Sequence, residues 1–245
     1  MLLKNCYQNI LETSTVTLAT GAEDASYPLY RLYDRDIGRL FKTTAAVTTT
    51  VKVDQGASPA AIDRLLIPAG HNLSGMTLDI KWSTDDITYT AAVAQWVGAA
   101  GFINKEWASL TKRYWKFIIT TPGSIPQIAE LFLCPTYTWE KNPSRPNGAS
   151  DPAFNIERLQ SASGDIRYLK NGDPKQRRAY QMPRCREAQK DNIDALNDAW
   201  AGYKPFWLCD DAGIWIYGEI TAPINLRQVA AGTYAFDFTF QEVLP

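Results

Sequence analysis

Regular alternation of apolar and polar residues constrains this sequence most, because it has the two-residue period of a strand buried on one face. The pattern runs through residues 47–53, where valine and threonine alternate with threonine and lysine, and through 76–82, where Met, Leu, Ile and Trp occupy every second position. Shorter apolar runs at 62–67, 114–119 and 125–134 are typical of central strands. With turns predicted at 54–56 and 72–75, these segments predict an antiparallel β-sandwich or barrel.

Prolines at 135, 143, 146 and 152 interrupt the pattern and mark a change in organisation. Proline removes a backbone donor and forbids a continuous helix, so this stretch extends neither neighbouring core. We therefore predict a first domain over residues 1–135, a proline-rich linker or arm over 136–152, and a second domain over 153–245.

The second domain is predicted to be α+β with one helix. Apolar positions from 185 to 201 fit one helical face, and the run stops at Gly202, ahead of Pro205. Strands are predicted at 205–209 and 214–220, and at 234–240, where four aromatic rings occupy alternate positions. The predicted face of the helix is made by Ala188, Ile193, Leu196 and Trp200.

Composition excludes several function classes. Apolar residues make up 45% of the 245, which is ample for packed cores, and the 25 basic residues nearly balance the 26 acidic ones. With a net charge this close to zero, the chain as a whole has no electrostatic attraction to nucleic acid or to an anionic membrane. The sequence contains no apolar run long enough to span a membrane and no recognisable secretion signal.

The sequence predicts no catalytic residue, no metal site and no cofactor. His71 is the single histidine, so a proton shuttle would depend on this side chain alone. The four cysteines lie far apart without a CxxC pair and are predicted to be buried thiols, although Cys6 and Cys134 meet if the ends of the first domain lie together. The paired carboxylates at 85–86 and 210–211 fall in predicted turns, where Asp caps the backbone.

Five segments in register resemble the discoidin, or coagulation factor type C, β-sandwich over roughly residues 27–134. The resemblance implies a galactose-binding-like jelly roll that binds glycans, lipid headgroups or proteins through loops at one end. The five segments are Leu32-Tyr-Asp34-Arg-Asp36 with Phe41, Val51-Lys-Val-Asp-Gln-Gly56, Trp82-Ser-Thr-Asp-Asp86, Arg113-Tyr-Trp-Lys-Phe117 and Ile128-Ala-Glu-Leu131.

Carried over to this chain, the resemblance makes the loop 27–39 the candidate ligand site, with Tyr30, Arg31, Tyr33 and Arg35 as its residues. Aromatic rings with guanidinium donors suit sugars, because a pyranose face packs on a ring while hydroxyl groups accept hydrogen bonds. A purely structural role for the segment is the alternative. The aromatic stretch 96–107 is a second candidate, and it suits a core equally well.

The second domain is similar to the C-terminal part of bacteriophage tail-tip or distal-tail proteins. A basic strand at 167–184 precedes the helix, the helix ends in Gly202-Tyr-Lys-Pro-Phe206, and the chain closes with an aromatic strand followed by Gln241-Glu242. The resemblance implies a tail-tube-like β-structure flanked by one helix that assembles as a ring. In distal-tail proteins the ring-forming domain usually comes first, whereas here the order is inverted.

Seven basic residues against one acid give the segment 167–186 a net charge of +6. Three interpretations are open: a solvated face, a basic hairpin turning at 171–174 that meets an acidic neighbouring subunit, and a nucleic-acid surface. We rank nucleic acid last. The predicted oligomer interface comprises Arg167, Lys170, Lys175, Arg177, Arg178, Trp200 and Trp215.

Taken together, the sequence predicts a non-enzymatic structural component of a phage tail tip or baseplate. It would be made in the host cytoplasm and incorporated into the virion tail. The predicted partners are further copies in a homo-oligomeric ring, other tail or baseplate proteins and a host-surface glycan. A stand-alone glycan-binding protein is the alternative, and an enzyme such as a glycan depolymerase comes third.

Overall fold

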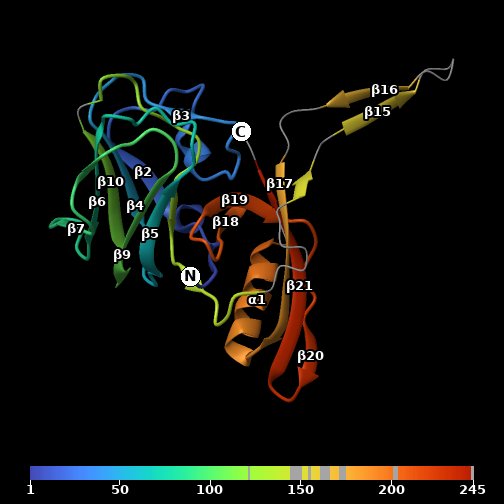
Figure 1. Ribbon diagram of the computed structural model, residues 1–245. Coiled ribbons are helices and arrows are strands. Elements are labelled where there is room, and N and C mark those ends of the chain that lie inside the picture. Colours follow the sequence, from blue (N-terminus) through green and yellow to red (C-terminus); the bar gives the residue numbers. More distant parts are fainter. Residues whose placement is uncertain are drawn as a thin grey trace. The chain divides into compact units, whose positions relative to one another are not determined.

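The computed structural model describes residues 1–120, 122–143, 151–153, 156–160, 166–170, 175–200 and 204–243 (Figure 1). The chain divides into two compact units, one formed by Cys6–Tyr137 and the other by Met1–Asn5 together with Thr138–Leu244. The first five residues were predicted to belong to the first domain. They instead supply strand β1 (Lys4–Cys6) to the sheet of the C-terminal unit.

The first unit is an antiparallel β-sandwich, as the alternation predicts. One sheet has the order β2-β4-β10-β6-β7, with β8 also paired to β6, and the facing sheet has the order β12-β5-β9. A short pair, β11-β3, lies apart from both. The elements are η1 (Ile10–Thr13), β2 (Thr15–Thr20), η2 (Leu29–Leu32), β3 (Phe41–Lys42), β4 (Thr49–Asp54), β5 (Ala61–Ile67), β6 (Thr77–Ser83), β7 (Thr90–Ala91), β8 (Trp96–Val97), β9 (Ile103–Thr111), β10 (Tyr114–Thr120), β11 (Gln127–Ile128) and β12 (Phe132–Cys134).

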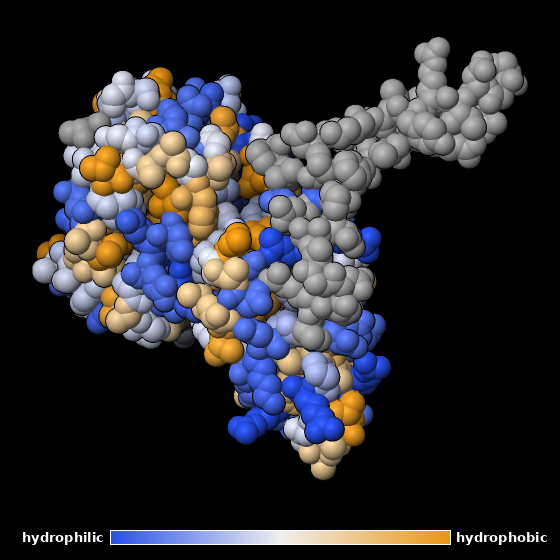
Figure 2. Space-filling view, viewed as in Figure 1, coloured by the Kyte–Doolittle hydropathy of each residue, from blue (hydrophilic) through white to orange (hydrophobic). Residues whose placement is uncertain are grey.

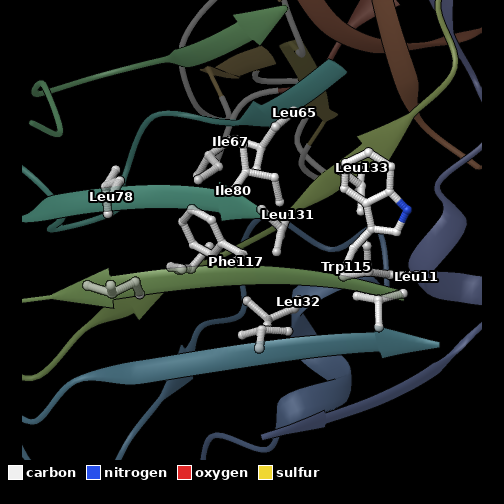
Figure 3. Close-up of a cluster of buried hydrophobic side chains, with 14 of the residues drawn as sticks. Leu11, Leu32, Leu65, Ile67, Leu78, Ile80, Trp115, Phe117, Leu131 and Leu133 are labelled. Carbon is white, nitrogen blue, oxygen red and sulfur yellow. The ribbon is translucent and has the colours of Figure 1, made fainter. Parts of the chain in front are cut away.

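Alternate residues of the two sheets fill one apolar core. Leu78 and Ile80 of β6 lie beside Phe117 of β10, and they face Leu65 and Ile67 of β5 (Figure 3). All five are at most 2% exposed. Val47 departs from the prediction, because it precedes β4 and is 44% exposed.

The predicted turns form through Asp side chains that bind the backbone. The Asp54 carboxylate accepts from the Gly56 amide at 2.8 Å, and Gly56 adopts a φ of +74° that favours glycine. The Asp85 carboxylate accepts from the amides of Ile87 and Thr88 at 2.9 and 3.0 Å. These bonds lower the pKa of Asp85 to about 2, so a structural role accounts for this carboxylate.

The C-terminal unit is an antiparallel sheet with one helix among its described residues, which agrees with the predicted α+β class. The sheet order is β13-β1-β18-β19-β21-β17-β14, and β20 pairs with the start of β21, at residues 233–235. The remaining elements are β13 (Tyr137–Thr138), β14 (Asp151–Ala153), β15 (Ile156–Gln160), β16 (Ile166–Lys170), β17 (Lys175–Cys185), α1 (Glu187–Trp200), β18 (Phe206–Cys209), β19 (Trp215–Ile220), β20 (Arg227–Ala230) and β21 (Thr233–Glu242).

Helix α1 packs on the aromatic face of β21, where Phe236, Phe238 and Phe240 are at most 6% exposed. Its buried positions include Ile193 and Leu196, as predicted, but Ala188 is exposed and Gln189 is buried in its place. The Gln189 side-chain oxygen explains the difference, because it accepts from the Glu140 amide at 3.0 Å. The side chain of Trp200 lies outside the described residues.

Two further predictions about this unit are wrong. Segment 136–152 is not wholly a linker, because β13 and β14 pair into the main sheet, although residues 144–150 lie outside the described residues. The basic segment does not form a hairpin about 171–174: β16 pairs with β15, whereas β17 pairs with β14 and β21. Residues 171–174 themselves lie outside the described residues.

Candidate functional site

Strand register identifies the end of the sandwich at which the long loops gather. Asp54 lies beside Tyr114, and Tyr114 beside Ser83, so the short connections share one end. Thr120 pairs with Thr77 and Ile103 with Ile67 at the other. This second end, at the top in Figure 1 near β3, is called the loop end here, and it comprises residues 21–48, 68–76, 98–102 and 122–126.

Asn72 fastens one loop of this end to another. Its side-chain nitrogen donates to the Ile125 carbonyl at 2.8 Å, and its side-chain oxygen accepts from the Gln127 amide at 2.7 Å. Gln127 in turn pairs with Lys42 across the β11–β3 ladder. Loops that are distant in sequence are thereby fixed in register, which is the preorganisation that a binding surface needs.

His71 holds a third loop. Its Nε2 donates to the Gly101 carbonyl at 2.6 Å, while Nδ1 accepts from the Leu73 amide at 3.1 Å. This pattern requires the neutral imidazole. Burial lowers the pKa of His71, and the hydrogen bond to Gly101 opposes that change. Both ring nitrogens serve the loop fold, so the histidine acts as a structural link.

Two cations of the loop end lie over the Tyr27 ring. The Lys42 Nζ lies 3.9 Å from the ring centroid, and the Arg31 guanidinium lies 5.6 Å from it. The Lys42 amide also donates to the Tyr27 carbonyl at 3.2 Å, which keeps β3 against this loop. Neither cation has a carboxylate within ion-pair distance in the described part of the chain.

Several apolar side chains are exposed at the same end. Tyr30 is 49% exposed and Phe102 is 36% exposed, and both lie on its loops. Val47 and Ile125 are exposed there as well, and Val97 flanks them at the end of β8. In the space-filling view, hydrophobic and hydrophilic residues lie intermixed over the sandwich (Figure 2). Exposed rings beside unpaired cations form a surface on which an apolar ligand face and its hydroxyl groups can both be satisfied.

The four residues predicted for this site divide into two pairs. Tyr30 and Arg31 of η2 lie at the loop end, where Arg31 donates from Nη1 to the Leu40 carbonyl at 3.3 Å. The Arg31 Nε is buried without a hydrogen-bond partner. Tyr33 is half-buried against the core, and burial raises the pKa of its hydroxyl group, with the nearby Glu23 adding to the rise.

Arg35 differs most clearly from its predicted role as a ligand-binding residue, because it is only 8% exposed. Its guanidinium pairs with Glu12, donates to the Tyr7 carbonyl at 2.9 Å and lies 4.5 Å from the centroid of the Phe132 ring. Its backbone amide donates to the buried Glu130 at 2.9 Å. Arg35 therefore ties the loop to the sandwich and is not a ligand group.

The second predicted stretch, 96–107, is divided between the core and the surface, because Val97 and Phe102 are exposed. Trp96 and Trp107 are partly buried against it, and the Trp107 Nε1 donates to the Ile62 carbonyl at 3.1 Å. Its ring lies 5.8 Å from that of Trp115. The two tryptophans therefore provide packing for the sandwich.

The opposite end carries a comparable set of rings and charges, but these groups satisfy one another. Lys52 pairs with Asp86, and the Tyr89 hydroxyl donates to the same carboxylate at 2.5 Å. The Lys116 Nζ lies 3.7 Å from the Tyr89 ring centroid. These contacts hold the β6–β7 turn, and the pKa of Asp86 is lowered by its bonds to Lys52 and Tyr89. Lys112 also lies over a ring at this end, 4.2 Å from the Trp82 centroid, and Ile87 is 83% exposed.

The predicted interface residues are only partly accessible. Arg178 is turned inward, where its Nη1 lies 2.5 Å from a carboxylate oxygen of Asp210, itself 2% exposed at the side chain. Arg177 is exposed, whereas Lys175 and Trp215 are half-buried. The side chains of Arg167, Lys170 and Trp200 lie outside the described residues.

No group of metal-ligating side chains occurs among the described residues. All four cysteines are free and buried, and Cys6 contributes to raising the pKa of Cys134, so the two thiols are neighbours. In the described part of the chain, every helix is too short or too polar to cross a membrane.

The sequence prediction did not single out several residues at or beside the loop end: Lys42, Asn72 and Gln127, and Tyr27 within the predicted loop 27–39. Tyr27 is the first residue of the candidate segment, and the Pro28 that follows it was the one local indication of a loop at this point. Lys42 and Gln127 meet only through strand pairing between distant segments, which no local pattern reports.

No protein-family model and no curated protein matches this sequence. Among solved structures, chitosan-binding module 1 of a chitosanase/glucanase from Paenibacillus sp. IK-5 is similar at 18% identity and a TM-score of 0.45, over 53% of this chain and 98% of that one. A CBM32 module of a family 31 glycoside hydrolase from Clostridium perfringens matches at 17% identity and a TM-score of 0.44, over 53% and 99%. A fucosidase from Ruminococcus gnavus matches at 16% identity and a TM-score of 0.46, and only 27% of that chain is covered.

Proposed function

We propose that the protein binds a glycan through the loop end of its sandwich. The observation that carries the proposal is the Tyr27 ring flanked by Lys42 and Arg31, whose charges have no carboxylate partner within the described residues. A sugar ring can pack on Tyr30 of the same end, which is 49% exposed, while its hydroxyl groups accept from the ammonium and guanidinium groups. The fixed loops reduce the entropy lost on binding.

A glycan array on the full chain tests this proposal. The expected result is retention of one saccharide class, lost or weakened at least about tenfold in Tyr27→Ala and in Lys42→Ala, since each removes one recognition group. Tyr89→Phe at the opposite end is the matched control, and it should bind as the unaltered protein does. Binding that survives both loop-end substitutions would refute the site.

A structural component of a phage tail tip or baseplate is the second candidate function, located in the virion tail. One feature favours it: in its described residues the C-terminal unit combines an antiparallel sheet with one helix, the arrangement implied by the resemblance to tail proteins. In this role the protein would be a non-enzymatic structural component. Negative-stain images of the purified protein test this candidate, and closed rings are the expected result.

A further inference from the structure

Helix α1 carries a narrow acidic stripe. Glu187, Asp191, Asp194 and Asp198 recur at intervals of four, three and four residues, so at 100° per residue they fall within about 60° of arc. The buried positions Gln189, Ile193 and Leu196 point the opposite way. The stripe therefore lies along the crest of the helix that faces solvent, and the surface over α1 is strongly hydrophilic (Figure 2).

Only part of the charge of the stripe is compensated. Lys190 is its single ion-pair partner in the described residues, with Nζ 3.3 Å from Asp191 and 2.9 Å from Asp194. These two carboxylates raise the pKa of Lys190. Glu187 accepts from the Tyr234 hydroxyl at 3.4 Å, which adds no positive charge. The stripe keeps an excess of three negative charges.

Behind α1, the other face of the sheet is exposed along β17, β20 and β21, whereas Trp207 of β18 and Tyr217 of β19 on the same face are buried. Along β17 and β21 the residues alternate: Tyr180 and Phe238 point to the aromatic side on which α1 packs, and Arg177, Gln181 and Asp237 are exposed on the other. Arg227 of β20 pairs with Ala235 and so shares that exposed side.

Cations outnumber carboxylates on this uncovered face. The cations on this face are Lys175 and Arg177 of β17 and Arg227 of β20, and the carboxylates are Asp237 of β21 and Glu219 of β19. Arg184 is also exposed, in the β17 bulge. No carboxylate lies within ion-pair distance of Arg177, Arg184 or Arg227 in the described part of the chain. The C-terminal unit thus has an acidic side on its helix and a basic side on its sheet.

We propose that a second copy of this chain docks its acidic α1 stripe on the basic face of β17, β20 and β21. A second copy is the occupant because the same chain carries both complementary surfaces. The two surfaces lie on opposite sides of a two-layer unit, so the contact is heterologous, and a pair of copies retains one free acidic surface and one free basic surface. Association of this type continues to further copies, as a closed ring or a filament.

Exposed ion pairs are screened by salt and contribute little individually. Self-association is therefore expected to be salt-dependent and to strengthen with protein concentration. It does not depend on the proposed glycan site, because no residue of the loop end takes part.

Light-scattering mass measurement on the full chain at low and high salt tests the proposal. The unaltered protein should exceed the monomer mass at low salt and approach it at high salt. The reversals Asp191→Lys with Asp198→Lys, or Arg177→Glu with Arg227→Glu, should each weaken association at least about tenfold. Mixing the two reversed proteins should restore it, because each then offers the complement that the other lacks.

Adding lysines at the exposed Thr15 and Thr17 of β2 is the matched control, which alters net charge without changing either surface. This variant should associate as the unaltered protein does. A monomeric unaltered protein at low salt and high concentration would overturn the proposal, as would reversed variants that associate normally. Far-ultraviolet circular dichroism confirms that each variant is folded, so a loss of association reports the interface itself.

Discussion

At the scale of single residues, Arg35 shows why a side chain's type does not reveal its direction. An arginine between aromatic residues fits a sugar site, yet the Arg35 guanidinium pairs with Glu12 and donates to the Tyr7 carbonyl. We expect Arg35→Ala to lower the free energy of unfolding by about 3 kcal/mol, since it strips a buried partner from Glu12. Urea unfolding measures this. Arg39→Ala is the control, because Arg39 is 56% exposed, and it should cost less than about 0.5 kcal/mol.

Glu130 predicts a pH dependence of stability. Burial raises the pKa of its carboxyl group well above the usual 4.5, against the opposing effects of the Arg35 charge and amide. Because the folded state binds this proton more tightly than the unfolded chain, the contribution to stability is greatest below about pH 4.5. It is lost as the pH rises through the folded pKa.

Urea unfolding from pH 4.5 to pH 8 should therefore show this decline in the unaltered protein and a flatter profile in Glu130→Gln. Equal slopes in the two proteins would contradict the assignment. A carboxamide keeps the shape of the group and can still accept from Asn9 or from the Arg35 amide.

At the scale of elements, Gly98 sets the spacing of the loop end. A Cβ there would lie 2.2 Å from the Leu73 carbonyl oxygen, a backbone atom that can move only with its loop. Gly98→Ala should therefore separate residues 98–102 from 71–75 and reduce both the melting temperature and saccharide binding. Gly123→Ala, where nothing lies within 4 Å, is the control and should change neither. Calorimetry with the array saccharide measures both effects.

Helix α1 gives a second comparison of buried and exposed positions. Ile193 is fully buried, so Ile193→Ala should cost about 3 kcal/mol of unfolding free energy, whereas Ala188→Ser on the exposed side should cost less than about 0.5 kcal/mol. Urea unfolding distinguishes the two variants. Equal effects would contradict the observed orientation of the helix.

Local patterns predicted the elements well, because a half-buried strand imposes its period on its own residues. The strands β4, β6, β10 and β21 lie close to where alternation placed them. Pairing between distant segments has no local signal: β1 joins the C-terminal sheet, and β16 pairs with β15 although residues 171–174 favour a turn. For the same reason the sequence indicated Tyr30 and Arg31 but not Lys42.

At the scale of the whole molecule, the two units predict how the chain can be divided. A fragment of residues 6–137 should melt cooperatively, since it contains the complete sandwich core. The fragment 1–135 should be less soluble, because it carries strand β1 without the sheet in which that strand pairs. An unfolded 6–137 fragment would contradict the division.

Glycan binding at the loop end is the central claim, and NMR of the isotope-labelled full chain with the saccharide retained on the array tests it most directly. The predicted result is a set of chemical-shift changes centred on Tyr27, Arg31, Lys42, Asn72 and Gln127. Shift changes centred on Lys52, Asp86, Tyr89 and Lys116 at the opposite end, or no saccharide that perturbs the spectrum, would contradict it.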